Sequence, residues 1–443
     1  MGSGCETIVA GATPPGRSAL AVVRLSGPEA RRLFAKHFPS APHPPEERRA
    51  YYGWMVDEGG ERLDDGVGIF WAGPRSYTGE DTAEFSCHGN PLIADRLVRA
   101  LMRSGARLAR PGEFTQRAFE NGKLDLTQAE AVMDVISAQS DRALRMAGRA
   151  RAGSLSRAVA GLQERVVNHL AHVEAWIDFP EEDLSPEVGQ ELEAGLREVL
   201  RECQRLLGTA REGRLLRQGA MVVLAGVPNA GKSSLLNALL EEDRAIVSPV
   251  PGTTRDTIDA VVVMEGFPVR LVDTAGLRDG EDAVERQGVE RTRAALKEAD
   301  VVVWVEDGTG GVKGPVEGVP EGVPVVRCWT RADLEGFVAG PGVAVSAVTG
   351  SGVAELRAAV VEALRLGGES GAEGVALNRR QEEVVSRAAA ELEEGVRALE
   401  AGLAPELVAQ SLRGAQAAFG ELVGLQSSED VLDRLFQTFC IGK

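Results

Sequence analysis

Two hydrophobic patterns occupy the first half of the chain. Over residues 1–119, short apolar runs such as ALAVVRL and GVGIFW alternate with turns rich in Pro and Gly, and we expect a helix after Pro91. This alternation predicts a small α+β domain. Over residues 120–217 the apolar positions recur with the period of a helix, and Pro180 and Pro186 mark a break. The second stretch therefore predicts long helices of an up-and-down bundle.

A third pattern begins at residue 218. The runs AMVVLAG, PVRLVDTAG, DVVVWVE, VPVVRCW and GVAVSA are short and continuously apolar, and helical segments separate them up to about residue 370. Such alternation is typical of a doubly wound parallel sheet, whose strands are buried on both faces. After the linker LGGESGAEG the helical period returns. We therefore predict a multidomain protein, in which an α/β domain (218–370) is inserted into an all-α helical domain (120–217 and 371–443).

Chain length and cysteine content fit several folded domains in a reducing compartment. With 443 residues the chain exceeds the usual limit of one core, about 250–300 residues. Its five cysteines show no CxxC spacing, so neither a zinc site nor a disulfide framework is indicated. No apolar run reaches about 18 residues, and the chain does not open with a basic segment followed by an apolar one. We expect a soluble, cytoplasmic protein.

The charge balance argues against broad, non-specific binding of nucleic acid. The chain has 49 Lys and Arg against 66 Asp and Glu, a net charge of −17, whereas phosphate binding relies on clustered basic residues. A shaped RNA site remains possible. Lysine is scarce: six of the 49 basic residues are lysines and 43 are arginines. A lysine in a motif is therefore more informative than usual.

The clearest motif is GVPNAGKSS, Gly226 to Ser234, which follows a predicted strand and precedes a predicted helix. Glycines at such a position let backbone N–H groups turn toward the β-phosphate of a nucleotide. Lys232 would neutralise the β- and γ-phosphates, and the Ser233 hydroxyl would hold Mg²⁺. This P-loop predicts nucleotide contacts from Asn229, Ala230, Gly231, Lys232, Ser233 and Ser234.

Three more motifs follow in the order that a GTPase requires. PGTTRD supplies Thr253 and Thr254, the second as an Mg²⁺ ligand, in a switch segment that would fold around the γ-phosphate. DTAG ends a predicted strand with a metal-side carboxylate, and SAVTGSG ends the last strand beside the base. Together the motifs predict a GTPase of the translation-factor-like class, with contacts from Asp273, Thr274, Ala275, Gly276, Ser346 and Ala347.

Two motifs depart from common GTPases. Leu277 follows DTAG where Ras-type GTPases place the glutamine that orients the attacking water, so another group must orient it. The base-reading motif, usually Asn-Lys-X-Asp, is TRAD here, residues 330–333. Asp333 can accept from two guanine donors and Arg331 could stack on the base, but Thr330 is a poorer substitute for the asparagine. We expect guanine selectivity to survive.

With the inserted GTPase domain, its helical flanks and the terminal CIGK in view, the chain resembles the tRNA-modification GTPase MnmE family, also called TrmE. The resemblance covers nearly the whole chain. Besides the GTPase motifs it rests on TIVAGATPPGRSALAVVRLSG, SYTGEDTAEFSCHGN, ARPGEFTQRAFENGKLDLTQAEAV and FCIGK. Asn90 departs from the pattern, because the resemblance leads us to expect a second glycine after His88-Gly89.

The resemblance implies a cytoplasmic homodimer, built through the N-terminal domains, that works with the flavoprotein MnmG, also called GidA. Together they would attach an aminomethyl or carboxymethylaminomethyl group to C5 of the wobble uridine in certain tRNAs. The one-carbon donor would be 5,10-methylene- or 5-formyl-tetrahydrofolate, and FAD and NADH would belong to the partner. GTP, Mg²⁺ and K⁺ would belong to this chain.

Roles for particular residues of the GTPase domain also follow from the resemblance. A K⁺ ion acts in this family where other systems use an arginine finger. The water-orienting acid of the family corresponds to Glu285, although the residue by itself favours the interpretation of a solvated acid on a helix. Ligands of the K⁺ ion would come from Asn229, Ser248, Val250 and Thr253.

For folate, the resemblance implies positions matching Arg24, Glu84 and Lys123, with Lys443 reaching in from the C-terminus. Folates carry an anionic glutamate tail and a pterin with paired donors, so basic residues plus a carboxylate suit such a ligand. Arg24 alone would read as an ordinary strand-end arginine. Cys440 is a candidate catalytic residue, and a buried structural thiol would explain it equally well.

Other polar pairs have structural explanations. Cys87 and His88 are neighbours in a predicted strand, so their side chains should point to opposite faces rather than form a nucleophile and base. His169 and His172 have the spacing of a helical metal pair, but no acidic or cysteine cluster accompanies them. We expect them on a face of the bundle.

Two rival functions share some of these motifs. A GTPase of ribosome assembly would normally carry a basic RNA-binding module, which this acidic chain lacks. A lipid-anchored GTPase would rest on CIGK alone, yet Lys443 and Gly442 do not fit a prenylation box and no polybasic segment precedes it. We expect instead that the apolar face of the helix VLDRLFQTF fixes the tail, and that Gly442 lets its backbone approach a ligand closely.

Overall fold

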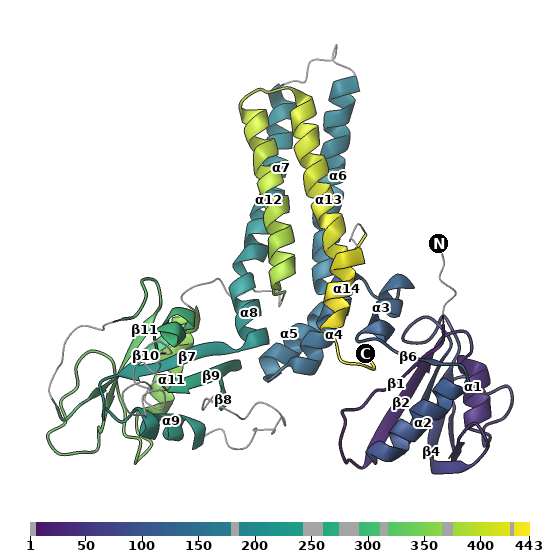
Figure 1. Ribbon diagram of the computed structural model, residues 1–443. Coiled ribbons are helices and arrows are strands. Elements are labelled where there is room, and N and C mark those ends of the chain that lie inside the picture. Colours follow the sequence, from purple (N-terminus) through teal and green to yellow (C-terminus); the bar gives the residue numbers. More distant parts are fainter. Residues whose placement is uncertain are drawn as a thin grey trace. The chain divides into compact units, whose positions relative to one another are not determined.

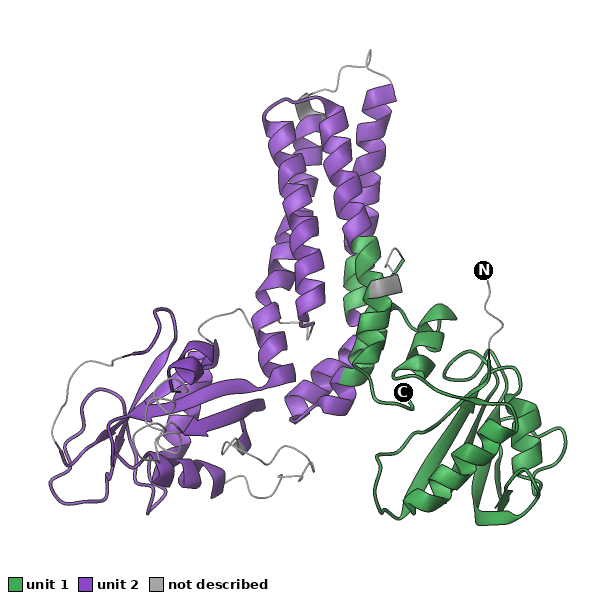
Figure 2. Cartoon of the chain, in the orientation of Figure 1, with its two compact units in different colours: residues 1–133, 155–159, 419–443 green, residues 134–154, 160–418 purple. Residues whose placement is uncertain are grey.

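Contacts within the computed structural model divide the chain into two units. Unit 1 comprises residues 1–133, 155–159 and 419–443, and unit 2 comprises residues 134–154 and 160–418 (Figure 2). Among the described helices, none combines the length and the hydropathy that a membrane span requires. The domain boundaries predicted at residues 119, 217 and 370 stay predictions. The structure describes residues 6–178, 186–241, 260–273, 292–310, 318–365, 375–425 and 429–443.

Unit 1 contains a sheet that includes β1, β2, β4 and β6 (Figure 1). Its complete strand order is β3-β4-β5-β2-β1-β6. Its pairs are antiparallel except for β1 with β6. The predicted α+β fold is confirmed, including the helix after Pro91. The elements are β1 (Ile8–Gly11), β2 (Leu20–Ser26), α1 (Ala30–His37), β3 (Ala50–Val56), β4 (Arg62–Trp71), β5 (Thr82–His88), α2 (Pro91–Arg103) and β6 (Arg107–Leu108).

Helix α2 explains the asparagine at position 90. The Asn90 side chain accepts a hydrogen bond from the Leu92 N–H at 3.0 Å, and Pro91 occupies the first helical position. An asparagine N-cap followed by proline is a favourable start for a helix, because proline has no N–H to leave unpaired. The glycine expected here would lack the capping side chain.

The sheet of unit 1 has one buried face and one partly exposed face. On the buried face, Phe34 and Phe38 of α1 stack with ring centroids 5.6 Å apart and both lie against Phe85 of β5. Alternate strand residues point to the other face. There Leu20, Tyr52 and Trp54 are exposed. The register also places Arg24 directly opposite Glu84 on that face.

A helical cluster completes unit 1. It consists of α3 (Glu113–Glu120), the start of α4 (Leu126–Ser137) and α14 (Glu429–Gln437). Phe436 and Phe439 are buried against Ala129 and Val132 of α4. The apolar face of the C-terminal helix therefore fixes the tail, as the sequence predicts.

The long helices of unit 2 form a bundle (Figure 1). His169 lies against Gly195 of the facing helix, where a Cβ atom would overlap the imidazole. Burial, and then the positive charges of His172 and Arg165, lower the pKa of His169. His169 and His172 both belong to the long helix Ser154–Asp178 of the bundle, where they were expected. The helices are α6 (Ser154–Asp178), α7 (Pro186–Gly208), α12 (Arg379–Glu400) and α13 (Pro405–Val423), with the shorter α5 (Asp141–Arg151) and α8 (Ala210–Gln218).

The second sheet has the order β12-β11-β10-β7-β9-β8. Its pairs are parallel except for the edge pair of β8 with β9, so the predicted α/β fold is confirmed. β8 was not expected, because its run merges with the apolar run of β9 across a two-residue turn. Both turn residues, Glu265 and Gly266, have positive φ, as a tight hairpin requires. The elements are β7 (Ala220–Gly226), α9 (Lys232–Glu241), β8 (Ala260–Met264), β9 (Phe267–Asp273), β10 (Val301–Asp307), β11 (Val325–Thr330), β12 (Val343–Ala344) and α11 (Val353–Arg365).

Arg217 joins the segments through which the chain passes between the helices and this sheet. It lies in α8, which leads directly into β7. Its guanidinium donates to the carbonyl oxygens of Ala376 (2.7 Å) and Leu377 (2.8 Å), which precede α12. It also pairs with Asp134 of α4 at 2.7 Å. One half-buried side chain thus connects three segments that are far apart in sequence.

Replacing Arg217 by methionine should lower the free energy of unfolding of unit 2 by about 2–4 kcal/mol, because a partly buried carboxylate and two carbonyls lose this donor. Urea unfolding followed by circular dichroism would measure the change. Arg197→Met is the matched control, since Arg197 pairs with Glu193 and Glu400 on an exposed helix face and should cost at most about 1 kcal/mol. Equal losses in the two variants would contradict the role of Arg217.

Candidate nucleotide and folate sites

The candidate nucleotide site lies at the carboxyl ends of the parallel strands, where open α/β sheets bind ligands. The strands β7, β9, β10 and β11 end at Gly226, Asp273, Asp307 and Thr330. The predicted P-loop connects β7 to α9, so it lies beside the ends of both neighbouring strands, β9 and β10. The topology therefore gathers the separate GTPase motifs at one edge.

Backbone geometry explains the glycines and the asparagine of the P-loop. At Gly226 φ is 142°, and a Cβ atom there would overlap the carbonyl oxygen of Val305 on β10. Asn229 and Gly231 have φ values of 63° and 87°. Glycine adopts such values freely, and asparagine does so more readily than most residues. The loop sequence is thus suited to a tight turn in close contact with β10.

Ser233 and Asp273 form the predicted metal-side pair. The Ser233 hydroxyl donates to Asp273 Oδ2 at 2.8 Å, although the two residues come from α9 and from the end of β9. Hydroxyl and carboxylate oxygens are the hard ligands that Mg²⁺ prefers, so the pair fits that ion. Lys232 is buried, and its ammonium donates to the carbonyl oxygens of Gly226 (3.1 Å) and Val227 (2.8 Å). The lysine is therefore held inside the P-loop.

The TRAD motif is tied to the P-loop by its first two residues. The buried Thr330 hydroxyl lies 2.6 Å from the carbonyl oxygen of Ala230 and 3.1 Å from that of Glu306. Arg331 donates to the Asn229 carbonyl oxygen at 3.0 Å and pairs with Asp307 at 2.8 Å. These contacts give Thr330 and Arg331 a structural role in holding the P-loop, which the sequence did not indicate.

Asp333, by contrast, is exposed and has no ion pair among the described residues. Ala332 N–H donates to the carbonyl oxygen of Val345 at 3.2 Å, which places TRAD beside the SAVTGSG loop. Within that loop the buried Ser346 hydroxyl accepts from Thr349 N–H at 3.1 Å, next to Ala347. The two base-side motifs therefore lie together, as predicted. Ser234 is exposed on the first turn of α9.

Several predicted site residues lie outside the described residues, and their roles stay predictions. They are the switch-segment and K⁺ positions, the rest of DTAG and the water-orienting acid, namely Ser248, Val250, Thr253, Thr254, Thr274, Ala275, Gly276 and Glu285.

In unit 1, the structure brings two of the predicted folate residues together with the C-terminal tail. Arg24 Nε donates to Glu84 Oε1 at 2.8 Å, and Arg24 Nη1 donates to the Gly442 carbonyl oxygen at 3.3 Å. The rings of Tyr77 and Phe114 lie 5.5 and 5.7 Å from the guanidinium. A cation, a carboxylate and aromatic rings in one place suit a ligand with a planar, hydrogen-bonding ring.

Backbone contacts hold the tail in place. Ile441 forms an isolated antiparallel bridge with Pro111, and Phe114 N–H donates to the Lys443 carbonyl oxygen at 3.2 Å. Gly442 has φ of 95°, and a Cβ atom there would overlap the Gly11 carbonyl oxygen. The close approach predicted for Gly442 is therefore made to β1. Cys440 is exposed, so the alternative of a buried structural thiol is wrong.

Lys123 lies on a neighbouring loop. Its ammonium donates to the Pro74 carbonyl oxygen at 2.9 Å, and Asn121 donates to the Thr78 carbonyl oxygen at 2.8 Å. Both contacts hold the loop that carries Tyr77. Lys123 is therefore tied to the loop that reaches the Arg24 group, while its role toward a ligand stays a prediction.

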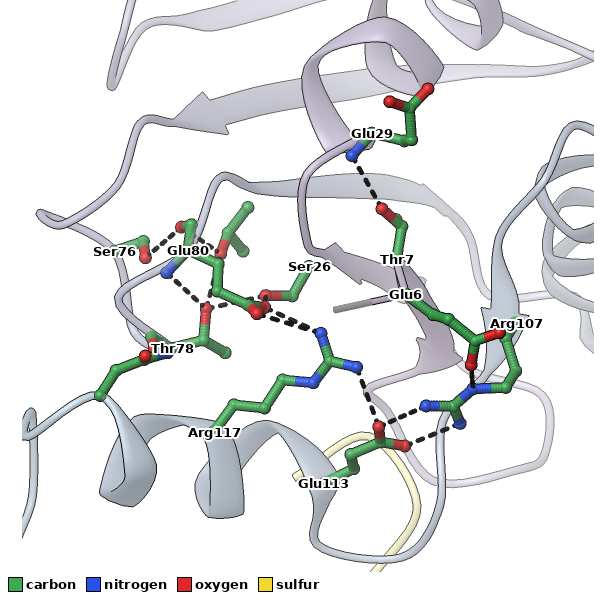
Figure 3. A network of polar contacts seen from close by, with 12 residues as sticks. Glu6, Thr7, Ser26, Glu29, Ser76, Thr78, Glu80, Arg107, Glu113 and Arg117 are labelled. Atoms are coloured by element: carbon green, nitrogen blue, oxygen red, sulfur yellow. Dashed lines mark hydrogen bonds and ion pairs between the residues drawn. The ribbon is translucent and has the colours of Figure 1, made fainter. Parts of the chain in front are cut away.

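Sequence reasoning missed the polar network behind this site, which Figure 3 shows. Arg117 lies between Glu80, at 3.0 Å, and Glu113, at 2.9 Å, and Arg107 also pairs with Glu113 at 2.6 Å. Burial raises the pKa of Glu113, but hydrogen bonds from Arg107, the Arg110 N–H and Arg117 outweigh it and lower the pKa to about 2. The i,i+4 spacing of Glu113 and Arg117 was the only local signal.

The strand pair Cys87 and His88 behaves as expected, because Cys87 is buried and His88 is exposed. Burial raises the pKa of the Cys87 thiol to about 11, which leaves it protonated near neutral pH. His88 Nδ1 lies 3.0 Å from Asp64 Oδ1. The hydrogen bond to Asp64, and then the charge of that carboxylate, raise the pKa of His88. Cys87 and His88 thus lie on opposite faces of the strand, while His88 groups with Asp64 and Asp65, whose ligand atoms lie within 4.8 Å of one another.

Comparison with known proteins agrees with this arrangement. Residues 7–123 match the family model of the GTP-binding protein TrmE N-terminus, and residues 126–440 match that of the MnmE helical domain. The relative in Symbiobacterium thermophilum is 45% identical over 99% of this chain and 100% of its own. Those in Thermus thermophilus (44%) and Akkermansia muciniphila (43%) each align over 99% of both chains. All three are named tRNA modification GTPase MnmE, and the present chain belongs to this MnmE, or TrmE, family.

Proposed function

We propose that the protein is a K⁺-dependent GTP hydrolase that modifies C5 of the wobble uridine in certain tRNAs together with the flavoprotein MnmG. The added group is aminomethyl or carboxymethylaminomethyl, and a tetrahydrofolate supplies the one-carbon unit. The observation that carries the proposal is the presence, in one chain, of a formed Ser233–Asp273 pair and of a C-terminal tail bound beside Arg24. The first suits phosphoryl transfer and the second suits a separate ligand site.

For GTP hydrolysis, the described residues bind and orient the phosphates. Lys232 and the P-loop backbone neutralise the β- and γ-phosphates, and Ser233 holds Mg²⁺ with Thr254 of the switch segment. Asp273 keeps the Ser233 hydroxyl in position through the 2.8 Å hydrogen bond. When bound, Mg²⁺ lowers the negative charge that the phosphates present to the attacking water. The remaining task, orienting that water, falls to Glu285, since Leu277 cannot do it.

A K⁺ ion beside the P-loop would take the place of an arginine finger. Asn229 supports this proposal, because it is exposed and its side-chain amide has no hydrogen-bond partner among the described residues. Its backbone is left-handed, with φ of 63°, as the tight turn of the loop requires. The other ligands would come from the switch segment, at Ser248, Val250 and Thr253.

In unit 1, Arg24, Glu84, Lys123 and Lys443 would bind the folate. The Arg24–Glu84 pair is formed in advance by strand register, so binding needs no rearrangement of these two side chains. The exposed Cys440 would then lie beside the ligand, where its thiol can act on the one-carbon unit. When bound, the folate supplies that carbon, and the protein residues hold and orient it.

The proposed homodimer would use the exposed face of the sheet in unit 1. Leu20, Tyr52 and Trp54 lie on this face, and Tyr52 is 74% exposed. Large exposed apolar residues on one sheet face are typical of an interaction surface. Because Arg24 and Glu84 lie on the same face, a dimer formed there would place the folate residues at or near its interface.

We expect the carboxylate of Asp333, which has no ion pair among the described residues, to recognise the guanine base. Asp333→Asn should shift the preference from GTP toward XTP, because an amide can donate to the base where the carboxylate could only accept. Competition binding with the two nucleotides would measure the shift. Leu334→Ala, at an exposed neighbouring position, should leave the preference unchanged. If the Asp333→Asn protein still prefers GTP, another group reads the base.

Hydrolysis should depend on K⁺, because Asn229 offers an additional oxygen ligand beside the phosphates. Turnover in KCl should exceed turnover in NaCl at equal concentration by about 10²-fold, because loss of one group that stabilises transition-state charge typically costs about 10²–10³ in turnover. Asn229→Ala should remove the difference between the two salts. Equal rates of the unchanged protein in both salts would exclude the ion from the mechanism.

Deleting residues 440–443 should separate the two activities. The tail contacts lie in unit 1, so K⁺-dependent GTP hydrolysis should continue, whereas binding of 5-formyl-tetrahydrofolate and modification of tRNA with the flavoprotein should be lost. Gly442→Ala is a second variant that keeps Cys440 and Lys443 but clashes with Gly11, and it should weaken folate binding. A truncated protein that binds the folate and modifies tRNA normally would contradict the proposed role of the tail.

A further inference from the structure

Helix α5 is basic in an otherwise acidic chain. Its eleven residues include four arginines and one aspartate, whereas the whole chain has a net charge of −17. Arg142 pairs with Glu212 of α8. Arg145 and Arg149 are both exposed, and no carboxylate among the described residues lies within ion-pair distance of either. Asp141, the one carboxylate of α5, is also exposed and lies four residues before Arg145, but no ion pair joins the two in the described structure.

Helix α2 offers a comparison within the same chain, because its exposed arginines are paired. It carries three exposed arginines, and each has a carboxylate partner: Glu61 for Arg96, Asp95 for Arg99 and Glu58 for Arg103. The two helices thus have similar length and arginine spacing but different surroundings. A chain with 66 acidic residues could readily supply partners for α5, and its described part supplies none for Arg145 and Arg149.

The unpaired arginines lie on the outer face of a firmly packed helix. Ala143, Met146 and Ala147 of α5 are buried in the same core as Leu215 and Phe267. The opposite face carries Arg145 and Arg149, one turn apart, so their Cβ atoms lie about 5–6 Å from each other. Between them Gly148 opens onto free space, because a Cβ atom there would meet nothing within 4 Å. A ligand can therefore reach both guanidinium groups.

Contacts at the start of α5 fix the direction of this face. The Ser140 side chain accepts from Ala143 N–H as an N-cap and donates to the Gly266 carbonyl oxygen at 2.6 Å. Arg142 lies over the ring of Phe267, with its guanidinium 4.4 Å from the centroid. The helix is thus anchored to the β8–β9 hairpin on one side. Arg145 and Arg149 therefore lie on a helix whose orientation relative to the hairpin is fixed.

We propose that the exposed face of α5, with Arg145 and Arg149 as its charged contacts, binds the phosphate backbone of the tRNA substrate. The inference rests on the proposed function in tRNA modification. Guanidinium groups suit phosphate oxygens because their N–H donors form a planar fork. An acidic protein surface is the weaker alternative, since the centres of protein interfaces are depleted of charge and rich in large apolar residues. Near these arginines α5 exposes one large apolar side chain, that of Leu144, which is little for the centre of a protein interface.

Binding of unfractionated tRNA to the full-length protein tests the proposal. Arg145→Gln combined with Arg149→Gln should weaken binding about 10-fold at 0.1 M salt, and the slope of log affinity against log salt should fall by about 1–2, one for each phosphate that the variant no longer neutralises. Arg96→Gln combined with Arg99→Gln removes the same charge from α2 and should change neither. Replacing Arg145 and Arg149 by lysines should restore most of the salt slope.

GTP turnover should stay at the wild-type rate in the glutamine variants, because neither residue belongs to the nucleotide site. Unchanged tRNA affinity and salt slope in the α5 variant would overturn the proposal, and so would an equal loss in the α2 control. Loss of flavoprotein binding with unchanged tRNA binding would also overturn it, in favour of a protein interface. A protein that binds tRNA through α5 but modifies no uridine would contradict the proposed function alone.

Discussion

Segments near the two ends of the chain meet in unit 1, and the geometry of the candidate folate site depends on this meeting. Arg24 on the second strand donates to Gly442, 418 positions away, and Gly442 leaves no space for a side chain against Gly11. The entropic cost of closing such a loop grows only slowly with its length. Helix α14 also shortens the effective loop, because Phe436 and Phe439 pack against α4 and so hold the tail close to unit 1. The site therefore requires residues from both ends of the chain to be folded together.

The chain enters the second sheet from α8 and leaves it toward α12, and both connections are held together by one side chain. A domain inserted between two helices has two connections to its host, and in this protein Arg217 binds both. It lies in the helix before β7 and donates to the carbonyls before α12. A change in the position of β7 therefore acts on two helices at once. The hairpin of β8 and β9 adds a third contact through Ser140 and Gly266.

Much of the nucleotide site could be predicted because its motifs are local in sequence. Gly226, Lys232 and Ser233 act within a single turn, and their spacing alone indicates a phosphate. What the sequence did not indicate are contacts that depend on register and packing. Thr330 donates a hydrogen bond to the carbonyl oxygen of Ala230 in the P-loop, 100 positions earlier. No local sequence pattern predicts this contact. β8 was missed for a related reason, since a two-residue turn hardly interrupts an apolar run.

The residues proposed to bind folate show the same division between local and long-range information. Arg24 and Glu84 were identified through family resemblance, because sequence alone makes Arg24 an ordinary strand-end arginine. Their pairing follows from the register of β2 with β5. The network behind them, centred on Arg117, needs residues from α3 and from the loop before β5. Carboxylates at positions 80 and 113 look like ordinary surface acids until the fold brings one guanidinium between them.

The exposed arginines of α2 and α5 differ in whether a carboxylate lies beside them. An acidic protein that acts on a polyanion repels it at long range, but at physiological ionic strength this repulsion is screened over about 8 Å. Attraction is then decided locally, by whether a cation has a carboxylate neighbour. On α2 each exposed arginine has one, so its charge is already compensated. On α5 Arg145 and Arg149 do not have one among the described residues. Net charge therefore says little about where such a protein meets nucleic acid, and the pairing of individual arginines says much more.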